Sequence, residues 1–118
     1  MSPTERELKY LREQGFVAEV VEKWIPQTHT RRDLFGFADI IYFDEGGVGL
    51  CQVTTVHNMP ARVKKVLASD LARRWVTVAN RCLLVVGWKK YAKKVDGKMW
   101  RRRCNWIFPE DFAASPDA

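Results

Sequence analysis

The stretch FGFADIIYFDEGGVGLCQVTTV, residues 35–56, carries two strand patterns around a tight turn and decides the fold. Phe35 to Phe43 and Val48 to Val56 are rich in aromatic and β-branched residues, which is typical of strands. Asp44-Glu45-Gly46-Gly47 between them is a strong turn signal, so the two runs predict a β-hairpin. If these four residues form the loop, opposed residues have numbers that sum to 91. This register predicts three opposed pairs: Asp39 with Gln52, Phe37 with Thr54, and Ile41 with Leu50.

The pairing of Asp39 with Gln52 is the most informative consequence of this register. Directly opposed side chains share one face of a sheet, so two polar groups would meet among Phe, Ile and Leu residues. A carboxylate on an apolar face is costly unless a cation or hydrogen-bond donors compensate it. Two interpretations therefore stay open: Asp39 binds a metal ion, or it pairs with Arg31, Arg32 or a backbone amide.

The residues before this hairpin predict a helix and then a strand. Ser2-Pro3-Thr4-Glu5 is typical of a capping box with Pro at the first helical position, and Gly15 ends the helix. Phe16 to Ile25 is rich in Val and predicts a strand closed by Pro26. The polar segment QTHTRRD, residues 27–33, predicts a loop.

The residues after the hairpin predict a crossover helix, a buried strand and a second hairpin. Asn58 and Pro60 open a helix that runs to about Val78, and Leu83 to Trp88 is the continuous apolar run of a strand covered on both sides. Lys89 to Phe108 predicts a basic hairpin that turns at Asp96-Gly97, and Pro109 to Ala118 predicts a short turn and a frayed tail. The order α-β-β-β-α-β with a β extension predicts an α/β fold, with a central mixed sheet flanked by helices.

Length and composition predict one globular domain spanning residues 1–118, because 118 residues can bury one core and not two. Hydrophobic residues at 47% and charged residues at 29% exclude a disordered tail or a fibrous repeat. No apolar run approaches the roughly 18 residues of a membrane helix, and the polar start MSPTERE is not typical of a signal peptide. Cys51, Cys82 and Cys104 form no CxxC pair, which favours a reducing, cytoplasmic location.

The charge is unevenly distributed along the chain. Residues 60–103 contain 14 Lys and Arg against 2 Asp, a balance of +12, whereas the rest contains 6 basic and 12 acidic residues, a balance of −6. Such asymmetry indicates a polyanionic partner, with nucleic acid favoured over a membrane surface, or a basic face that is only solvated. Acidic residues in a nucleic-acid-binding protein repel phosphate unless a metal ion lies between them.

The predicted basic hairpin interleaves its cations with Trp88, Tyr91, Trp100 and Trp106. Lys and Arg would contact phosphates and an exposed aromatic ring would stack on an unpaired base, unless the rings pack inward and the charges are only solvated. No base-reading motif is visible, so recognition of backbone and shape is expected. The nucleic-acid-binding residues that we expect are Arg31, Arg32, Arg62, Lys65, Lys89, Lys90, Lys93, Lys94, Arg101, Arg102 and Arg103.

The order of elements, with GFAD at residues 36–39 and CQVT at residues 51–54, resembles the PD-(D/E)XK nuclease superfamily. Residues 8–88 look like the small phage and archaeal Holliday-junction resolvases and VRR-NUC domains, and RRDLFGFADI followed by LCQVTT is the strongest match. The resemblance implies a restriction-endonuclease-like αβββαβ core and Mg²⁺- or Mn²⁺-dependent DNA hydrolysis. It also implies branched DNA as substrate, a homodimer, and the cytoplasm of a bacterial or phage-infected cell.

In this family an Asp and a Glu hold the metal, and a Lys two residues after the Glu positions the attacking water. Asp39 matches the Asp, but Gln52 stands at the Glu position and Thr54 at the Lys position. A Gln carbonyl coordinates Mg²⁺ without adding charge, and Thr54 orients a water without adding positive charge. The resemblance therefore leaves two mechanisms open: a working metal site, or a fold that has lost its metal and only binds nucleic acid.

Other residues can compensate for both departures. The catalytic residues that we expect are Asp39, Gln52, Thr54 and Lys64, with Arg62 and Lys65 as the other cations that open the following helix. The metal ligands that we expect are Asp39, Gln52, the Val53 carbonyl, Asp33 and Glu22, with Glu5 and Glu7 of the first helix as alternatives. Glu5 also has a capping role, Asp33 can pair within its Arg-rich loop, and Glu22 can point to solvent.

Other site chemistries have less support in the sequence. His29 and His57 have no zinc-site spacing with the cysteines, and Cys51, expected on the face opposite Gln52, is more typical of a buried thiol than of a nucleophile. A metal-dependent, structure-selective DNA endonuclease is thus the favoured function. The alternatives are a non-catalytic nucleic-acid-binding or regulatory protein on a degenerate nuclease fold, and a module whose basic face binds an acidic protein.

Overall fold

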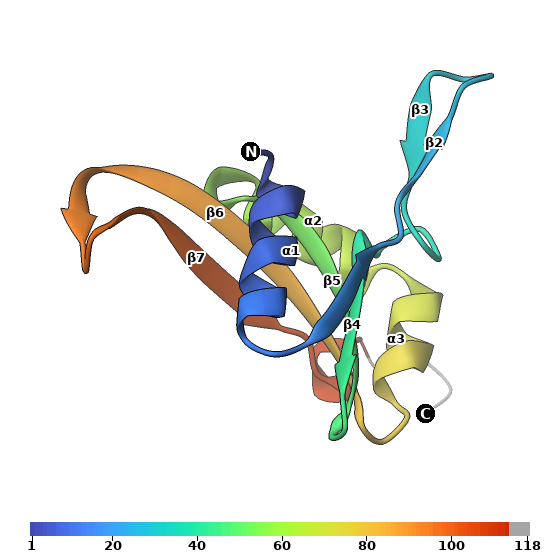
Figure 1. Cartoon of the computed structure of the whole chain (residues 1–118). Coiled ribbons are helices and arrows are strands. Elements are labelled where there is room, and N and C mark those ends of the chain that lie inside the picture. The colour runs from blue at the N-terminus through green and yellow to red at the C-terminus, as the bar shows by residue number, and fades with distance from the viewer. Residues whose placement is uncertain (114–118) are drawn as a thin grey trace.

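A five-stranded mixed sheet forms the centre of the molecule in the computed structural model, which describes residues 1–113 (Figure 1). The strand order is β1-β4-β5-β6-β7, with β5 and β6 parallel and the other neighbours antiparallel. The strands are β1 (Val17–Val20), β4 (Ile40–Asp44), β5 (Gly47–Thr55), β6 (Arg81–Val95) and β7 (Lys98–Trp106). The parallel pair confirms the mixed sheet that the sequence predicts.

Helices cover both faces of this sheet, as expected (Figure 1). The helices are α1 (Pro3–Glu13), α2 (Met59–Leu67) and α3 (Asp70–Val76), with short 3-10 turns at Val56–Asn58 and Pro109–Asp111. Leu11 of α1 packs in one apolar cluster with Ile40 and Val86, whereas Val66 of α2 packs in the other with Leu50 and Val85. Since α2 and α3 connect β5 to β6, the helical crossover from the third to the fourth strand of the predicted order is also present.

The central hairpin has the predicted register but a shorter turn. Pairs from Ile40 with Cys51 to Asp44 with Gly47 all sum to 91, so only Glu45 and Gly46 lie in the turn. The strand predicted from Phe35 to Phe43 begins only at Ile40, so the prediction is wrong for the residues before it. Phe35 and Gly36 have φ values of 56° and 81°, and the chain turns there. Phe37 therefore lies in this turn, outside the ladder that would have placed it opposite Thr54.

The predicted strand from Phe16 to Ile25 is divided in two. Residues 21 and 22 leave the central sheet, and β2 (Lys23–Ile25) pairs with β3 (Thr30–Arg32) as a separate hairpin. Figure 1 shows this hairpin projecting away from the body of the molecule. The predicted loop at residues 27–33 is therefore wrong for β3, where the hairpin turn brings the chain back to pair with β2.

The single helix predicted from Asn58 to Val78 is also divided. The chain breaks at Ala68 and Ser69, and the Ser69 hydroxyl accepts a hydrogen bond from the Ala72 amide at 3.2 Å, which caps α3. A Ser between two apolar runs favours a new N-cap over a continuous helix. At the other end of the chain, the Ser2–Glu5 capping box of α1 is present as predicted.

The second hairpin is confirmed and longer than the sheet that supports it. β6 and β7 meet at the turn Asp96-Gly97, and their outer halves extend beyond the other strands (Figure 1). Of the predicted closing segment, residues 109–111 form the 3-10 turn, and residues 114–118 lie outside the described residues. Among residues 1–113, none of the helices has the length and apolar character needed to cross a membrane.

Candidate functional site

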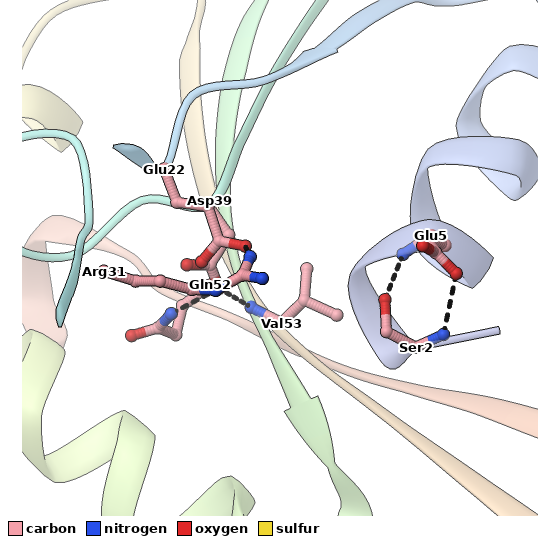
Figure 2. Close-up of polar contacts among 7 residues, drawn as sticks. All are labelled: Ser2, Glu5, Glu22, Arg31, Asp39, Gln52 and Val53. Carbon is pink, nitrogen blue, oxygen red and sulfur yellow. Dashed lines mark hydrogen bonds and ion pairs between the residues drawn. The ribbon is translucent and has the colours of Figure 1, made fainter. Parts of the chain in front are cut away.

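Three carboxylates converge at the root of the projecting hairpin. Glu22 lies just before β2, Asp33 just after β3 and Asp39 just before β4, and one oxygen of each lies within 4.8 Å of the others. Figure 2 shows Glu22 and Asp39 side by side where their segments leave the sheet. The projecting hairpin thus brings Glu22 and Asp33, which flank its two strands, together at its base.

Asp39 is held by two donors from β5. Its Oδ2 accepts from the Gln52 side-chain amide at 2.5 Å and from the Val53 backbone amide at 2.8 Å (Figure 2). This geometry confirms that Asp39 and Gln52 meet across the hairpin. Burial raises the pKa of Asp39 to about 7, the Val53 amide opposes the rise, and the neighbouring Asp33 adds to it. Near neutral pH the buried carboxyl therefore keeps a proton for much of the time unless another positive charge takes its place.

Lys65 of α2 connects the acidic cluster to Gln52. Its Nζ donates to Asp33 Oδ2 at 3.1 Å and to Gln52 Oε1 at 3.4 Å. Gln52 is fully buried, its amide nitrogen faces Asp39 and its amide oxygen faces Lys65. In this orientation Gln52 positions Asp39 and directs no oxygen at the three carboxylates, which differs from the metal-ligand role that we expect from the sequence.

The cluster opens into a polar pocket of about 490 Å³. Arg31 Nη1 donates to Glu22 Oε1 at 2.9 Å (Figure 2), so one of the pocket arginines is already paired. The pocket is lined by Thr4, Glu22, Arg31, Arg32, Asp33, Gly36, Asp39, Val53, Arg62 and Lys65. Nearly all the charged residues expected here from the sequence therefore surround one cavity, with acids at its base and cations around them.

Four residues of the expected site lie elsewhere. Lys64 is exposed on α2, and the described residues show no hydrogen bond between the buried Thr54 side chain and the cluster. Glu5 is bound to Ser2 in the capping box, away from the cluster in Figure 2. Glu7 is fully buried and binds Arg102, with both contacts at 2.7 Å. The compensating acids are thus Glu22 and Asp33, and the cation in place is Lys65.

The sequence analysis did not predict the ion pair between Glu7 and Arg102. Trp88 Nε1 also donates to Glu7 at 3.2 Å, and the Arg102 guanidinium lies over the Tyr10 ring. The signal was present, because Glu7 stands four residues before the buried Leu11 and so shares its helix face. Arg102, which we expect from the sequence to bind nucleic acid, also joins the long hairpin to α1 through Glu7.

The other basic residues of the long hairpin are exposed, but most of its aromatic rings are covered. The exposed cations are Arg81, Lys89, Lys90, Lys93, Lys94, Lys98, Arg101 and Arg103. The Arg6 guanidinium lies 3.7 Å from the Trp100 ring centre, and Arg101 lies 4.2 Å from that of Tyr91. This hairpin therefore offers charge along its length, and those two rings are occupied by the protein's own cations.

Neither a protein-family model, nor a curated protein, nor a solved structure matches this chain.

Proposed function

We propose that the protein is a metal-dependent DNA endonuclease of the PD-(D/E)XK type. The observation that carries the proposal is the convergence of Glu22, Asp33 and Asp39 in a cation-lined pocket. The element order supports it, since one helix, three antiparallel strands, a helical crossover and a parallel strand follow the restriction-endonuclease-like αβββαβ order that the resemblance implies.

The three carboxylates fit Mg²⁺ or Mn²⁺, which both favour hard anionic oxygen ligands. Glu22, Asp33 and Asp39 would hold the ion, with the Val53 carbonyl as a further ligand. When bound, the ion would supply the Lewis acidity that activates a water molecule and neutralises the scissile phosphate. Gln52 would act as a positioning residue, because it holds Asp39 in place from the buried side.

Lys65 takes the part of the missing motif Lys in this proposal. Thr54 has no charge and lies outside the pocket lining, whereas the Lys65 ammonium touches Asp33 at the pocket. A fixed cation beside the reacting phosphate stabilises the charge that develops during hydrolysis. We therefore assign this role to Lys65 in preference to Lys64, which is not among the residues that line the pocket.

DNA is the proposed substrate because cations surround the cluster and continue along the long hairpin. Arg32 and Arg62 line the pocket, and Lys89 to Lys94 extend the basic surface along β6. Phosphate contacts of this kind bind the backbone without reading sequence. A branched substrate, a homodimer and a cytoplasmic site of action belong to the same proposal through the family resemblance.

A non-catalytic nucleic-acid-binding protein is the second candidate, and one observation favours it. Arg31 and Lys65 already pair with Glu22 and Asp33, at 2.9 Å and 3.1 Å, so two carboxylates of the cluster have cationic partners from the chain itself. These ion pairs neutralise two of the carboxylates without a metal. The two candidates differ in whether a divalent ion displaces these side chains.

Cleavage assays with added metal separate the two functions. Four-way, flapped and linear DNA are incubated with the wild type, Asp39→Asn, and the control Glu45→Gln, which alters an exposed turn residue. The nuclease proposal expects cleavage with Mg²⁺ or Mn²⁺, none with EDTA, background cleavage by Asp39→Asn, and wild-type cleavage by the control. DNA binding by the wild type without cleavage of any form, at every metal concentration, would support the second candidate and refute the first.

A further inference from the structure

The projecting β2–β3 hairpin is a separate two-stranded sheet outside the central sheet. It forms no pairing with the five-stranded sheet, and all of its strand residues except Ile25 are exposed. An isolated two-stranded hairpin is only marginally stable in water. Yet its two ends carry Glu22 and Asp33 of the acidic cluster, so the hairpin extends directly from the candidate site (Figure 1).

Trp24 stands on this hairpin with half of its surface exposed, at 51%. Trp24 is directly opposed to Arg31, so the two side chains share one face of the hairpin. Arg31 reaches Glu22 from that face, which is therefore the face that leads to the acidic cluster (Figure 2). The His29 ring lies 6.2 Å from the Trp24 ring between centres, at an interplanar angle of 64°, and among residues 1–113 no Lys or Arg lies over the Trp24 ring.

The surroundings of Trp24 are cationic. Lys23, Arg31 and Arg32 are the charged residues of the segment 23–32, which contains no Asp or Glu. An exposed indole beside several cations matches the two parts of a nucleotide, because a base stacks on an aromatic ring and the phosphates bind the cations. On the long hairpin, by contrast, the rings of Trp100 and Tyr91 are already covered by Arg6 and Arg101.

We propose that the β2–β3 hairpin binds an unpaired segment of DNA by stacking a base on Trp24, next to the acidic cluster. Within a duplex both faces of each base are already stacked, so only a flap, a junction or a single strand presents a free base to the indole. This inference rests on the proposed nuclease function for its substrate class, and it adds the side chain that selects DNA structure.

The test measures binding with no metal present, so it does not depend on cleavage. Fluorescence anisotropy with EDTA compares labelled single-stranded, flapped and fully paired DNA for the wild type, Trp24→Ala and Trp24→Phe. The matched control is Phe43→Ala, because Phe43 is an aromatic residue exposed to a similar extent, at 49%, and lies on β4 outside both basic hairpins. Thermal unfolding of each variant checks that the fold is retained.

Trp24→Ala should weaken binding of single-stranded and flapped DNA by roughly 5- to 150-fold, the range that base stacking supports. Trp24→Phe should recover most of this loss, while binding of paired DNA by Trp24→Ala, and of all DNA forms by the Phe43→Ala control, should change by less than about twofold. An equal loss for paired DNA, no loss at all, or tighter binding of single-stranded RNA than of DNA would overturn the inference. Because the assay excludes metal, loss of cleavage in Asp39→Asn with normal binding leaves it intact, and failure of the stacking test leaves the cleavage result intact.

Discussion

Replacing Asp39 with Asn should remove a pH dependence of stability that the buried carboxyl builds into the fold. Burial raises the pKa of Asp39 from 3.8 to about 7 in the folded chain. The folded protein therefore keeps a proton that the unfolded chain has already released between these pH values. Since the folded state then binds more protons, the free energy of unfolding contributed by this group is fully present below pH 3.8 and is lost as the pH rises through about 7.

The size of this effect follows from the two pKa values. A difference of one in pKa is worth about 1.4 kcal/mol, so the whole loss is about 4 kcal/mol. About 3 kcal/mol of it falls between pH 5 and pH 8.5, where proteins are convenient to study. Divalent ions should oppose the loss above pH 7, because a bound cation replaces the proton as the partner of the carboxylate.

Urea unfolding at constant ionic strength measures this directly. The free energy of unfolding of the wild type minus that of Asp39→Asn should fall by about 3 kcal/mol from pH 5 to pH 8.5, because Asn does not titrate. Adding Mg²⁺ should reduce the fall in the wild type and leave the variant unchanged. A difference that stays flat over this pH range, or that grows with pH, would refute the assignment of the retained proton to Asp39.

Two further predictions concern the long hairpin. Glu7→Gln should lower the free energy of unfolding by about 3–5 kcal/mol in urea unfolding, because Arg102 would remain buried without its counter-charge. The double variant Glu7→Leu with Arg102→Leu should recover most of this lost stability. A loss below about 1 kcal/mol in Glu7→Gln would contradict a stabilising role for the ion pair. Replacing Lys93 and Lys94 with Ala should reduce the slope of log K against log salt for duplex DNA by about 2, whereas the control Arg73→Ala should leave it unchanged; an unaltered slope would exclude this part of the hairpin from the phosphate contacts.

Elements whose signals are local were predictable from the sequence. The capping box of α1 depends on Ser2 and Glu5 alone, and the register of the central hairpin depends on a turn next to two strand patterns. Once that register is known, the meeting of Asp39 and Gln52 follows from geometry, since opposed side chains share a face. The structure confirms this contact between Gln52 Nε2 and Asp39 Oδ2 at 2.5 Å.

Elements that depend on competing local preferences were predicted less well. The apolar run from Phe16 to Ile25 matches a strand, but the chain leaves the sheet after Val20 and starts a separate hairpin. The Val21 amide donates a hydrogen bond to the Asp39 carbonyl at 2.8 Å, a contact that the apolar pattern of residues 16–25 does not indicate. Similarly, a continuous helical pattern beyond Asn58 concealed the new helix start at Ser69.

The sequence by itself determined the kind of chemistry that is available. It places an aspartate opposite a glutamine in a predicted hairpin, with most acidic residues in the first half of the chain and most basic residues in the second. Tertiary structure alone decided which acids and cations meet, because Glu22 and Asp33 are brought together by a hairpin and Lys65 arrives from a helix after the central strands. Tertiary structure also decided that Glu7 is buried against Arg102 and that the Trp24 side chain is exposed. Contacts between residues far apart in the chain depend on how whole elements pack, and no local pattern of residues encodes that packing.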